Sequence, residues 1–443
     1  MRKNNILNWI KLSSFIFALS SLFASCSNEL DEALQPANNG TLQFVVSKFP
    51  TFGEGTKTRA IGTQDEGKTA WANEDKILVH LYSQKYGDQA VTLTFDAENN
   101  TWESDGGTLS YLENETPTIT AVYAPDCEIK SDKTIGLLEG KQYGEAEYIL
   151  AKTTISENTL DISFESGRTY SRLRIATMPE ATLTVTTTDF TPAGTTDVAT
   201  AAYILTTDNN GNAFLYGVFA EGATVSVKQG DITLKDYTFT AEKNPNGTEH
   251  NKSYALDATP VIDGTLGGKA TATEDDITAL VEQLKGYADN GITTIIVPGT
   301  EYAMYKSNLG TIPAFAEALY LLTDLNEDSP YCGTIDLILP DATEIIDFSF
   351  DSADALKSIT LPKVTTVGDG AFYGCYYLQT ITFGSVVTAI NHNTKAEFHW
   401  VGKKVEGCDL ILNREQVNAE ADYQPNIETR TWWNTEWKSI TLK

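Results

Sequence analysis

Positive charge is scarce in this chain. Its 443 residues contain 32 lysines and arginines against 60 aspartates and glutamates, which gives a formal net charge of −28. Nucleic acid and anionic lipid surfaces bind clustered basic side chains, so this composition counts against both as partners. After the first residues, no further run is apolar enough for a transmembrane helix.

Residues that usually catalyse reactions or bind metals are also few. The four histidines, at positions 80, 250, 392 and 399, are scattered, and none belongs to an H-E-x-x-H motif. No G-x-S-x-G sequence or glycine-rich phosphate loop occurs. We therefore predict a protein that is not an enzyme and uses no metal and no cofactor. Paired carboxylates for sugar hydrolysis remain open, because a sequence does not give their separation.

The chain has only five cysteines, and one of them, Cys26, directly follows a hydrophobic leader. Basic residues precede an apolar run from Leu12 to Phe23, an order typical of an export signal and too short for a membrane-spanning helix. "ASC" at the end of this run resembles a bacterial lipobox, although phenylalanine stands where leucine is commonest. We predict a signal peptide over residues 1–25, a lipid on Cys26 and a linker over residues 26–40. The alternative is an ordinary secreted protein with an incidental cysteine.

The predicted lipid would be the protein's contact with the outer membrane. Glu29, Asp31 and Glu32 resemble the acidic stretch behind the lipid cysteine of surface-exported lipoproteins, which implies an orientation toward the cell exterior. The other cysteines, Cys127, Cys332, Cys375 and Cys408, show no C-x-x-C spacing that would suggest zinc or redox chemistry. They could form two disulfides, but we favour mostly free buried thiols.

Residues 41–258 alternate apolar and polar side chains in short stretches. Examples are "TLQFVVSKF", "KILVHLY", "VTLTF" and "TLTVTTT", separated by turn-forming residues. No helical pattern intervenes, so we predict two antiparallel β-sandwiches, over residues 41–165 and 166–258.

Three segments of this half resemble the fimbrillin-like lipoproteins of Bacteroidetes. They are "TRA" at residues 58–60, "WANEDKILVHLY" from Trp71 and "FLYGVFAEGATVSVK" from Phe214. The resemblance implies transthyretin-like sandwiches. It also implies that pilus-building relatives are cut after an arginine, which frees a groove for a strand of the next subunit. Arg59 occupies a comparable place and could be cut; the other interpretation is a solvated loop charge.

A repeat of 22 residues follows. "LPDATEIIDFSFDSADALKSIT" begins at Leu339, "LPKVTTVGDGAFYGCYYLQTIT" at Leu361, and a degenerate copy at Phe383. This period is typical of a solenoid, in which each unit buries its apolar side against its neighbours. The second copy closely resembles the BspA-type leucine-rich repeats of bacterial surface proteins. We predict such a domain over residues 265–443, with Cys375 in its core.

Both ends of this repeat domain need a cap. Helical spacing after Thr273, with Asp276 placed for a capping box, and again after Pro313 predicts two helices at the first end. Trp432, Trp433 and Trp437 at the other end could form a cap core, which we favour, or a platform for stacking sugars.

Outward positions of the repeat strands form the candidate binding site. The two-residue period of a strand places them on one face. They are Asp336, Ile338, Ser358, Thr360, Thr380 and Thr382. Resemblance to BspA-type proteins implies adhesion to host matrix or bacterial surface proteins, and the N-terminal half suggests a pilus tip or accessory role with pilus subunits as partners. The alternative is a glycan-binding lipoprotein of a polysaccharide uptake system. Ser352, in "DSA", resembles an O-glycosylation acceptor.

Overall fold

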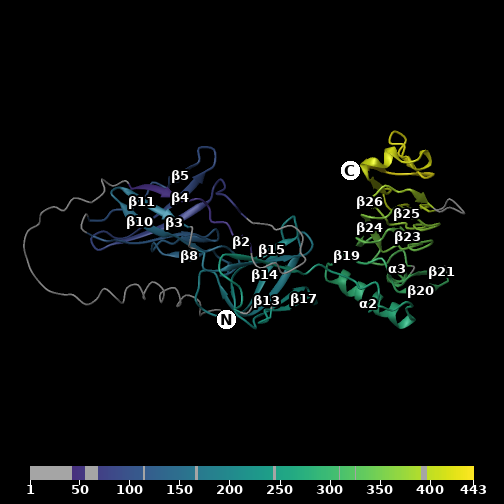
Figure 1. Ribbon diagram of the computed structural model, residues 1–443, viewed down its shortest axis with the longest axis horizontal. Coiled ribbons are helices and arrows are strands. Elements are labelled where there is room, and N and C mark those ends of the chain that lie inside the picture. Colours follow the sequence, from purple (N-terminus) through teal and green to yellow (C-terminus); the bar gives the residue numbers. More distant parts are fainter. Residues whose placement is uncertain are drawn as a thin grey trace, which may run out of the picture.

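The computed structural model describes residues 42–54, 68–112, 115–164, 168–242, 246–308, 310–324, 326–390 and 397–443. Cys26 and Arg59 lie outside these ranges. The protein is mainly β, and its sheets form three bodies that follow one another along the long axis (Figure 1). Within the described ranges, no helix combines the length and the apolar character needed to span a membrane.

The first body packs a five-stranded sheet against a three-stranded one. Val79, Leu93 and Leu160 are among the alternating side chains buried between them. This burial explains the two-residue period of the sequence. The larger sheet has the order β5 (Thr101–Ser104), β4 (Gly87–Asp96), β3 (Lys76–Ser83), β6 (Thr118–Tyr123) and β9 (Ile149–Leu150), and the smaller has β1 (Gln43–Val46), β11 (Thr159–Ser163) and β10 (Lys152–Ser156), with a separate ribbon of β7 (Cys127–Ile129) and β8 (Ile135–Leu137).

The second body is an eight-stranded sheet folded over its own core. Its long strand β13 (Thr182–Pro192) pairs with one neighbour before Asp189 and with another after it. Asp189 has a φ of 49° at a register shift, and such a bulge bends a strand. The order is β17 (Ile232–Thr238), β16 (Thr224–Gln229), β13, β15 (Asn212–Phe219), β12 (Ser171–Ala176), β18 (Lys252–Asp257) and β2 (Gly53–Glu54), with β14 (Ala199–Thr206) on β13.

Most strand pairs in these two bodies are antiparallel, as predicted, but three are parallel. They are β1 with β11, β12 with β18, and β18 with β2. Two of the three involve strands from the N-terminal segment, which contributes β1 to the first body and β2 to the second. A parallel pair requires a long connection, and alternation within a strand does not show which distant strand it joins.

Arg168 joins the first two bodies. Its side chain is 2% exposed, and its Nη2 atom lies 2.7 Å from Glu147 Oε1. Its Nη1 atom donates to Pro50 O at 2.8 Å and to Asn251 Oδ1 at 3.2 Å, and its guanidinium carbon lies 3.7 Å from the centre of the Phe52 ring. Burial raises the pKa of the Glu147 carboxyl, and the neighbouring Arg168 opposes this shift.

The third body begins with the predicted helices. Helix α2 (Glu274–Asp289) has Thr273 as its N-cap, and Thr273 and Asp276 form the predicted capping box. Helix α3 (Ala314–Leu322) follows Pro313. Both helices bury apolar side chains in the core of the repeats. The adjoining strands are β19 (Thr294–Ile296), β20 (Met304–Ser307) and β21 (Gly310–Pro313).

The repeats stack along two parallel sheets. Ile359 pairs with Ile381, and Ile345 pairs with Val367, so these neighbouring strands follow the predicted spacing of 22 residues. The longer sheet has the order β19, β22 (Ile335–Ile338), β24 (Leu356–Leu361), β26 (Thr380–Phe383), β28 (Asp409–Leu412) and β31 (Ser439–Leu442), and the shorter has β23 (Glu344–Ile345), β25 (Thr366–Val367) and β27 (Ala389–Ile390). The final cap contains η1 (Arg414–Asn418), η2 (Ala421–Tyr423), β29 (Thr431–Trp432) and β30 (Thr435–Glu436).

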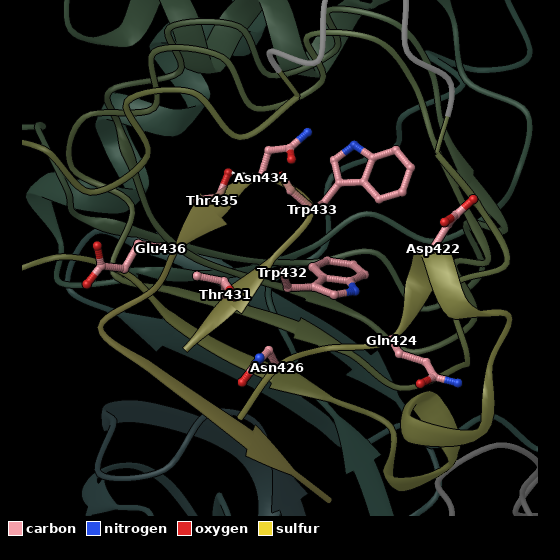
Figure 2. A pocket seen from close by; sticks show the side chains of 9 residues that line it. All are labelled: Asp422, Gln424, Asn426, Thr431, Trp432, Trp433, Asn434, Thr435 and Glu436. Carbon is pink, nitrogen blue, oxygen red and sulfur yellow. Dashed lines mark hydrogen bonds between the residues drawn. The ribbon is translucent and has the colours of Figure 1, made fainter. Parts of the chain in front are cut away.

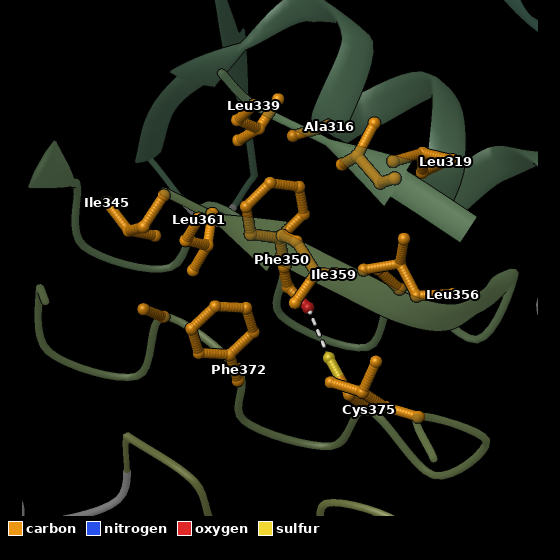
Figure 3. Packing of buried hydrophobic residues seen from close by; sticks show 14 of the residues in the cluster. Ala316, Leu319, Leu339, Ile345, Phe350, Leu356, Ile359, Leu361, Phe372 and Cys375 are labelled. Atoms are coloured by element: carbon orange, nitrogen blue, oxygen red, sulfur yellow. Dashed lines mark hydrogen bonds between the residues drawn. The ribbon is translucent and has the colours of Figure 1, made fainter. Parts of the chain in front are cut away.

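Between the two sheets lies a column of stacked phenylalanines. Phe372 lies between Phe350 and Phe398, with ring centroids 5.6 and 5.7 Å apart and interplanar angles of 10° and 9°. Cys375 Sγ donates to Phe350 O at 2.9 Å beside this column (Figure 3). Burial raises the pKa of the Cys375 thiol well above its usual range. Cys375 is therefore a core residue, as predicted.

Candidate functional site

The outer face of the longer sheet brings together all six residues predicted to bind a partner. We call this surface the strip: Asp336, Ile338, Ser358, Thr360, Thr380 and Thr382. Parallel pairing places equivalent residues of neighbouring strands side by side, so the strip has two rows. All six side chains are half-buried, while Ile359, Leu361 and Ile381 on the opposite face are buried.

The structure extends both rows beyond the predicted residues. The first row begins at Thr294 and continues from Thr380 to Asp409 and Ser439. The second begins at Ile296 and continues to Ile411 and Thr441. The outer face therefore spans six strands. Parallel strands lie about 4.8 Å apart, so each row presents side chains at regular intervals.

A serine and a lysine hold the carboxylate of Asp336. Ser358 Oγ donates to Asp336 Oδ1 at 2.6 Å, and Lys357 Nζ lies 3.5 Å from Asp336 Oδ2. The lysine reduces the negative charge of the strip at its first carboxylate.

The same arrangement returns at the C-terminal end of the sheet. Ser439 Oγ donates to Asp409 Oδ1 at 2.7 Å, and Lys438 Nζ lies 3.9 Å from Asp409 Oδ2. The sequence contained a signal for this continuation: "DLIL" occurs at residues 336–339 and 409–412, and "KSITL" occurs at residues 357–361 and 438–442. Sequence reasoning that followed the 22-residue period missed both second copies.

The strip suits a broad partner better than a small molecule. Its residues lie on one face of a parallel sheet, whereas small-molecule sites are concave and enclose most of their ligand. Its hydroxyl groups can donate and accept hydrogen bonds, and its isoleucines add apolar area.

Two of the three C-terminal tryptophans are buried in the final cap. Trp432 and Trp437 are each 2% exposed. Trp432 Nε1 donates to Tyr423 O at 2.9 Å, Trp437 Nε1 donates to Trp432 O at 3.2 Å, and both rings pack against Phe398. These contacts match the predicted cap core.

Trp433 is half-buried beside an open hollow of about 650 Å³ (Figure 2). Its Nε1 atom donates to Glu397 Oε2 at 3.1 Å, and its ring stacks on Tyr423 with a centroid distance of 5.4 Å and an angle of 2°. Trp432 and several polar side chains line the rest of the hollow. Two of the polar residues support turns of the cap: Gln424 donates to Ala419 O, and Asn426 accepts from the Thr429 amide. Gln424 and Asn426 thus serve the cap's own turns.

The remaining predicted positions are separate from the strip. Ser352 lies on a repeat turn with a φ of 53°, and its Oγ atom donates to Asp351 Oδ1 at 2.8 Å. Cys127, Cys332, Cys375 and Cys408 are free thiols. Burial raises the pKa of Cys127 to about 12, which removes its nucleophilic thiolate near neutral pH. Among the residues that the structure describes, no three His, Cys, Asp or Glu side chains are grouped closely enough to hold a metal ion.

Two comparisons with known proteins gave matches, one to a family and one to solved structures. Residues 331–397 match the family BspA type leucine-rich repeat region. A solved structure of a fimbrial protein from Bacteroides ovatus ATCC 8483 is similar over 49% of this chain and 48% of that chain, with 11% identity and a TM-score of 0.23. A candidate cell adhesion protein from the same strain is similar over 52% of this chain and 93% of that chain, with 14% identity and a TM-score of 0.23.

The chain spans about half the length of the first of these structures. Its sequence matches no curated protein. The family match covers the repeats on which the resemblance to BspA-type proteins is based. The chain is a mainly β protein, and its residues 331–397 match the BspA-type leucine-rich repeat family.

Proposed function

We propose that this chain is a lipid-anchored surface adhesin whose repeat domain binds another protein through the strip. The observation that carries the proposal is the outer face of the longer sheet, on which two rows of outward-facing side chains cross six strands. A face of this extent can contact a protein surface without a pocket. The match of residues 331–397 to BspA-type repeats supports a surface role.

The arrangement of the chain supports presentation of this face. The lipobox cysteine, Cys26, lies at the N-terminal end, and the repeat domain is the last of the three bodies (Figure 1). Each buried acyl methylene contributes about 0.8 kcal/mol, so two or three acyl chains would hold the protein in the outer membrane. The two β-bodies then act as a stalk between the membrane and the strip, which faces the cell exterior.

The partner in this proposal is a host matrix protein or a protein of another bacterial surface. The net charge of −28 favours partners with basic surfaces, because long-range attraction speeds their encounter. Lys357 and Lys438 limit repulsion at the strip's own carboxylates.

A pilus tip or accessory role is compatible with the same architecture. A cut after Arg59 would separate β1 and β2 from the rest of the chain, and both strands pair in parallel with later strands, β11 and β18. Their removal would expose a strand edge in each β-body for a strand of a pilus subunit.

The glycan-uptake alternative takes second place, because two of the three tryptophans on which it depended are buried. A competition assay tests the adhesin proposal. The lipid-free chain would be bound to immobilised collagen, fibronectin and laminin, and residues 265–443 or 41–258 would be added as competitors. We expect only residues 265–443 to compete. Competition by residues 41–258 alone would contradict the proposal and favour pilus assembly.

A further inference from the structure

A group of exposed and half-buried aromatic side chains lies on the turns of the last repeats, away from the strip. We call it the aromatic cluster: Tyr373, Tyr376, His399 and Trp400. The Trp400 ring is central to it, with ring centroids 5.3 Å from Tyr373, 6.1 Å from Tyr376 and 4.5 Å from His399. Tyr376 and Trp400 are close to parallel, at 19°.

The backbone at Trp400 is left-handed, which is unusual for tryptophan. Its φ is 66°, and the equivalent positions of the two preceding turns are Gly374, with 68°, and Ser352, with 53°. The turns are in register, because Ser352 N donates to Tyr373 O and Gly374 N donates to His399 O. Glycine adopts this conformation without steric cost, whereas a large side chain is strained there. Trp400 thus occupies a position that the preceding repeat fills with glycine.

Burial does not compensate for this strain. Trp400 is 40% exposed, the His399 side chain is also exposed, and the phenylalanine column beneath them is complete without either ring. Residues held in sparsely populated backbone conformations cluster at active sites and ligand clamps. The position of Trp400 therefore indicates a role at the surface.

Polar groups surround the rings. Lys403 Nζ lies 5.0 Å from the centre of the Trp400 ring, and Lys404 Nζ lies 2.6 Å from Glu327 Oε2. Flat aromatic faces bordered by amines, carboxylates and phenol hydroxyls suit a sugar ring, which has an apolar C–H face and a rim of hydroxyl groups. A polyanionic glycan fits less well, because Glu327, Asp351 and Asp354 lie on the neighbouring turns.

We propose that the aromatic cluster binds a neutral glycan, with a sugar ring stacked on Trp400 and Tyr376. This site is distinct from the strip and from the buried cap tryptophans. It would give the repeat domain two independent ligands, a protein on the strip and a carbohydrate on the turns.

The test uses the lipid-free full chain and isothermal titration calorimetry with cellohexaose, xylohexaose, mannohexaose and laminarihexaose, and with a heparin hexasaccharide as the anionic comparison. We expect at least one neutral hexasaccharide to bind. Trp400→Gly should weaken its affinity by about tenfold or more, equal to about 1.4 kcal/mol, while the melting temperature stays equal or rises, since glycine suits the left-handed backbone. Tyr376→Ala should weaken binding as well.

Tyr86 provides a matched control. It is a 37% exposed aromatic residue in the first body, with Lys85 Nζ 5.6 Å from its ring centre. Tyr86→Ala should leave the affinity unchanged. If Trp400→Gly unfolds the repeats, Trp400→Asn replaces it, since asparagine tolerates the same conformation. Binding of heparin alone, no binding of any neutral hexasaccharide, or wild-type affinity in the folded Trp400 variant would overturn the proposal.

Discussion

Replacing Phe372 with alanine tests whether the phenylalanine column holds the repeats together. The Phe372 ring is fully buried. It stacks on Phe350 with one face (Figure 3) and on Phe398 with the other. Truncation of a buried phenylalanine costs about 3–5 kcal/mol. Both neighbouring rings are fixed in their own turns and cannot close the cavity, so we expect about 4–5 kcal/mol.

The assay must report on the repeat domain alone, because the chain has several separate cores. We expect such a chain to unfold in more than one step. Hydrogen exchange measured by mass spectrometry on peptides from β24 and β26 gives this local stability. A loss of about 4 kcal/mol corresponds to roughly a thousandfold faster exchange of the best-protected amides. Peptides from β3 and β15, in the other bodies, should not change.

Thr382→Ala is the matched control, because Thr382 lies on the outer face of the same sheet. We expect it to change the stability by less than about 0.5 kcal/mol. Equal acceleration of exchange in the two variants would refute the assignment of inner and outer faces.

Three further predictions concern other parts of the chain. Arg168→Met leaves the buried Glu147 carboxylate without its partner and should destabilise the first two bodies by about 3–5 kcal/mol in thermal unfolding. Adding Glu147→Gln to the same chain should restore most of the lost stability. No recovery in this double variant would contradict the ion-pair explanation. Burial raises the pKa of Asp354 to about 6, so the folded state favours the protonated carboxyl and loses stability as the pH rises from about 4 to about 6. Asp354→Asn should therefore raise the melting temperature at pH 7.5 and not at pH 4, and an equal change at both would refute this. Cys26→Ala should abolish acyl labelling and release the protein from membranes, whereas surviving labelling would exclude Cys26 as the lipid site.

Local patterns predicted the local elements well. The alternation of Ile77, Val79 and Leu81 marks a strand, because one face of β3 is buried against the opposing sheet. Thr273 and Asp276 predicted the start of α2, since a capping box depends on neighbouring residues only. The 22-residue period also predicted the register of β22, β24 and β26, because each repeat pairs with the repeat that follows it in the sequence.

Features that depend on distant residues could not be predicted in this way. The parallel pairing of β1 with β11 joins segments more than a hundred residues apart, and Arg168 contacts residues from both β-bodies. The aromatic cluster was missed because Phe372 and Phe398 are 26 residues apart, which interrupts the 22-residue period. Only the structure places Trp400 at the position of Gly374.

The central claim, that the strip binds the protein partner, is tested most directly by adding charge to it. Ser358, Thr360, Thr380 and Thr382 would be changed together to lysine in the lipid-free full chain. The matched control places four lysines on an exposed row of β14 in the second body, at Thr200, Ala202, Ile204 and Thr206.

Affinity for the matrix protein that the chain binds would be measured by surface plasmon resonance, after circular dichroism has shown that both variants are folded. We predict at least about tenfold weaker binding for the strip variant, since lysines at its centre disrupt the contact surface, and unchanged binding for the β14 variant. Unchanged binding by a folded strip variant, or an equal loss in both variants, would contradict the account.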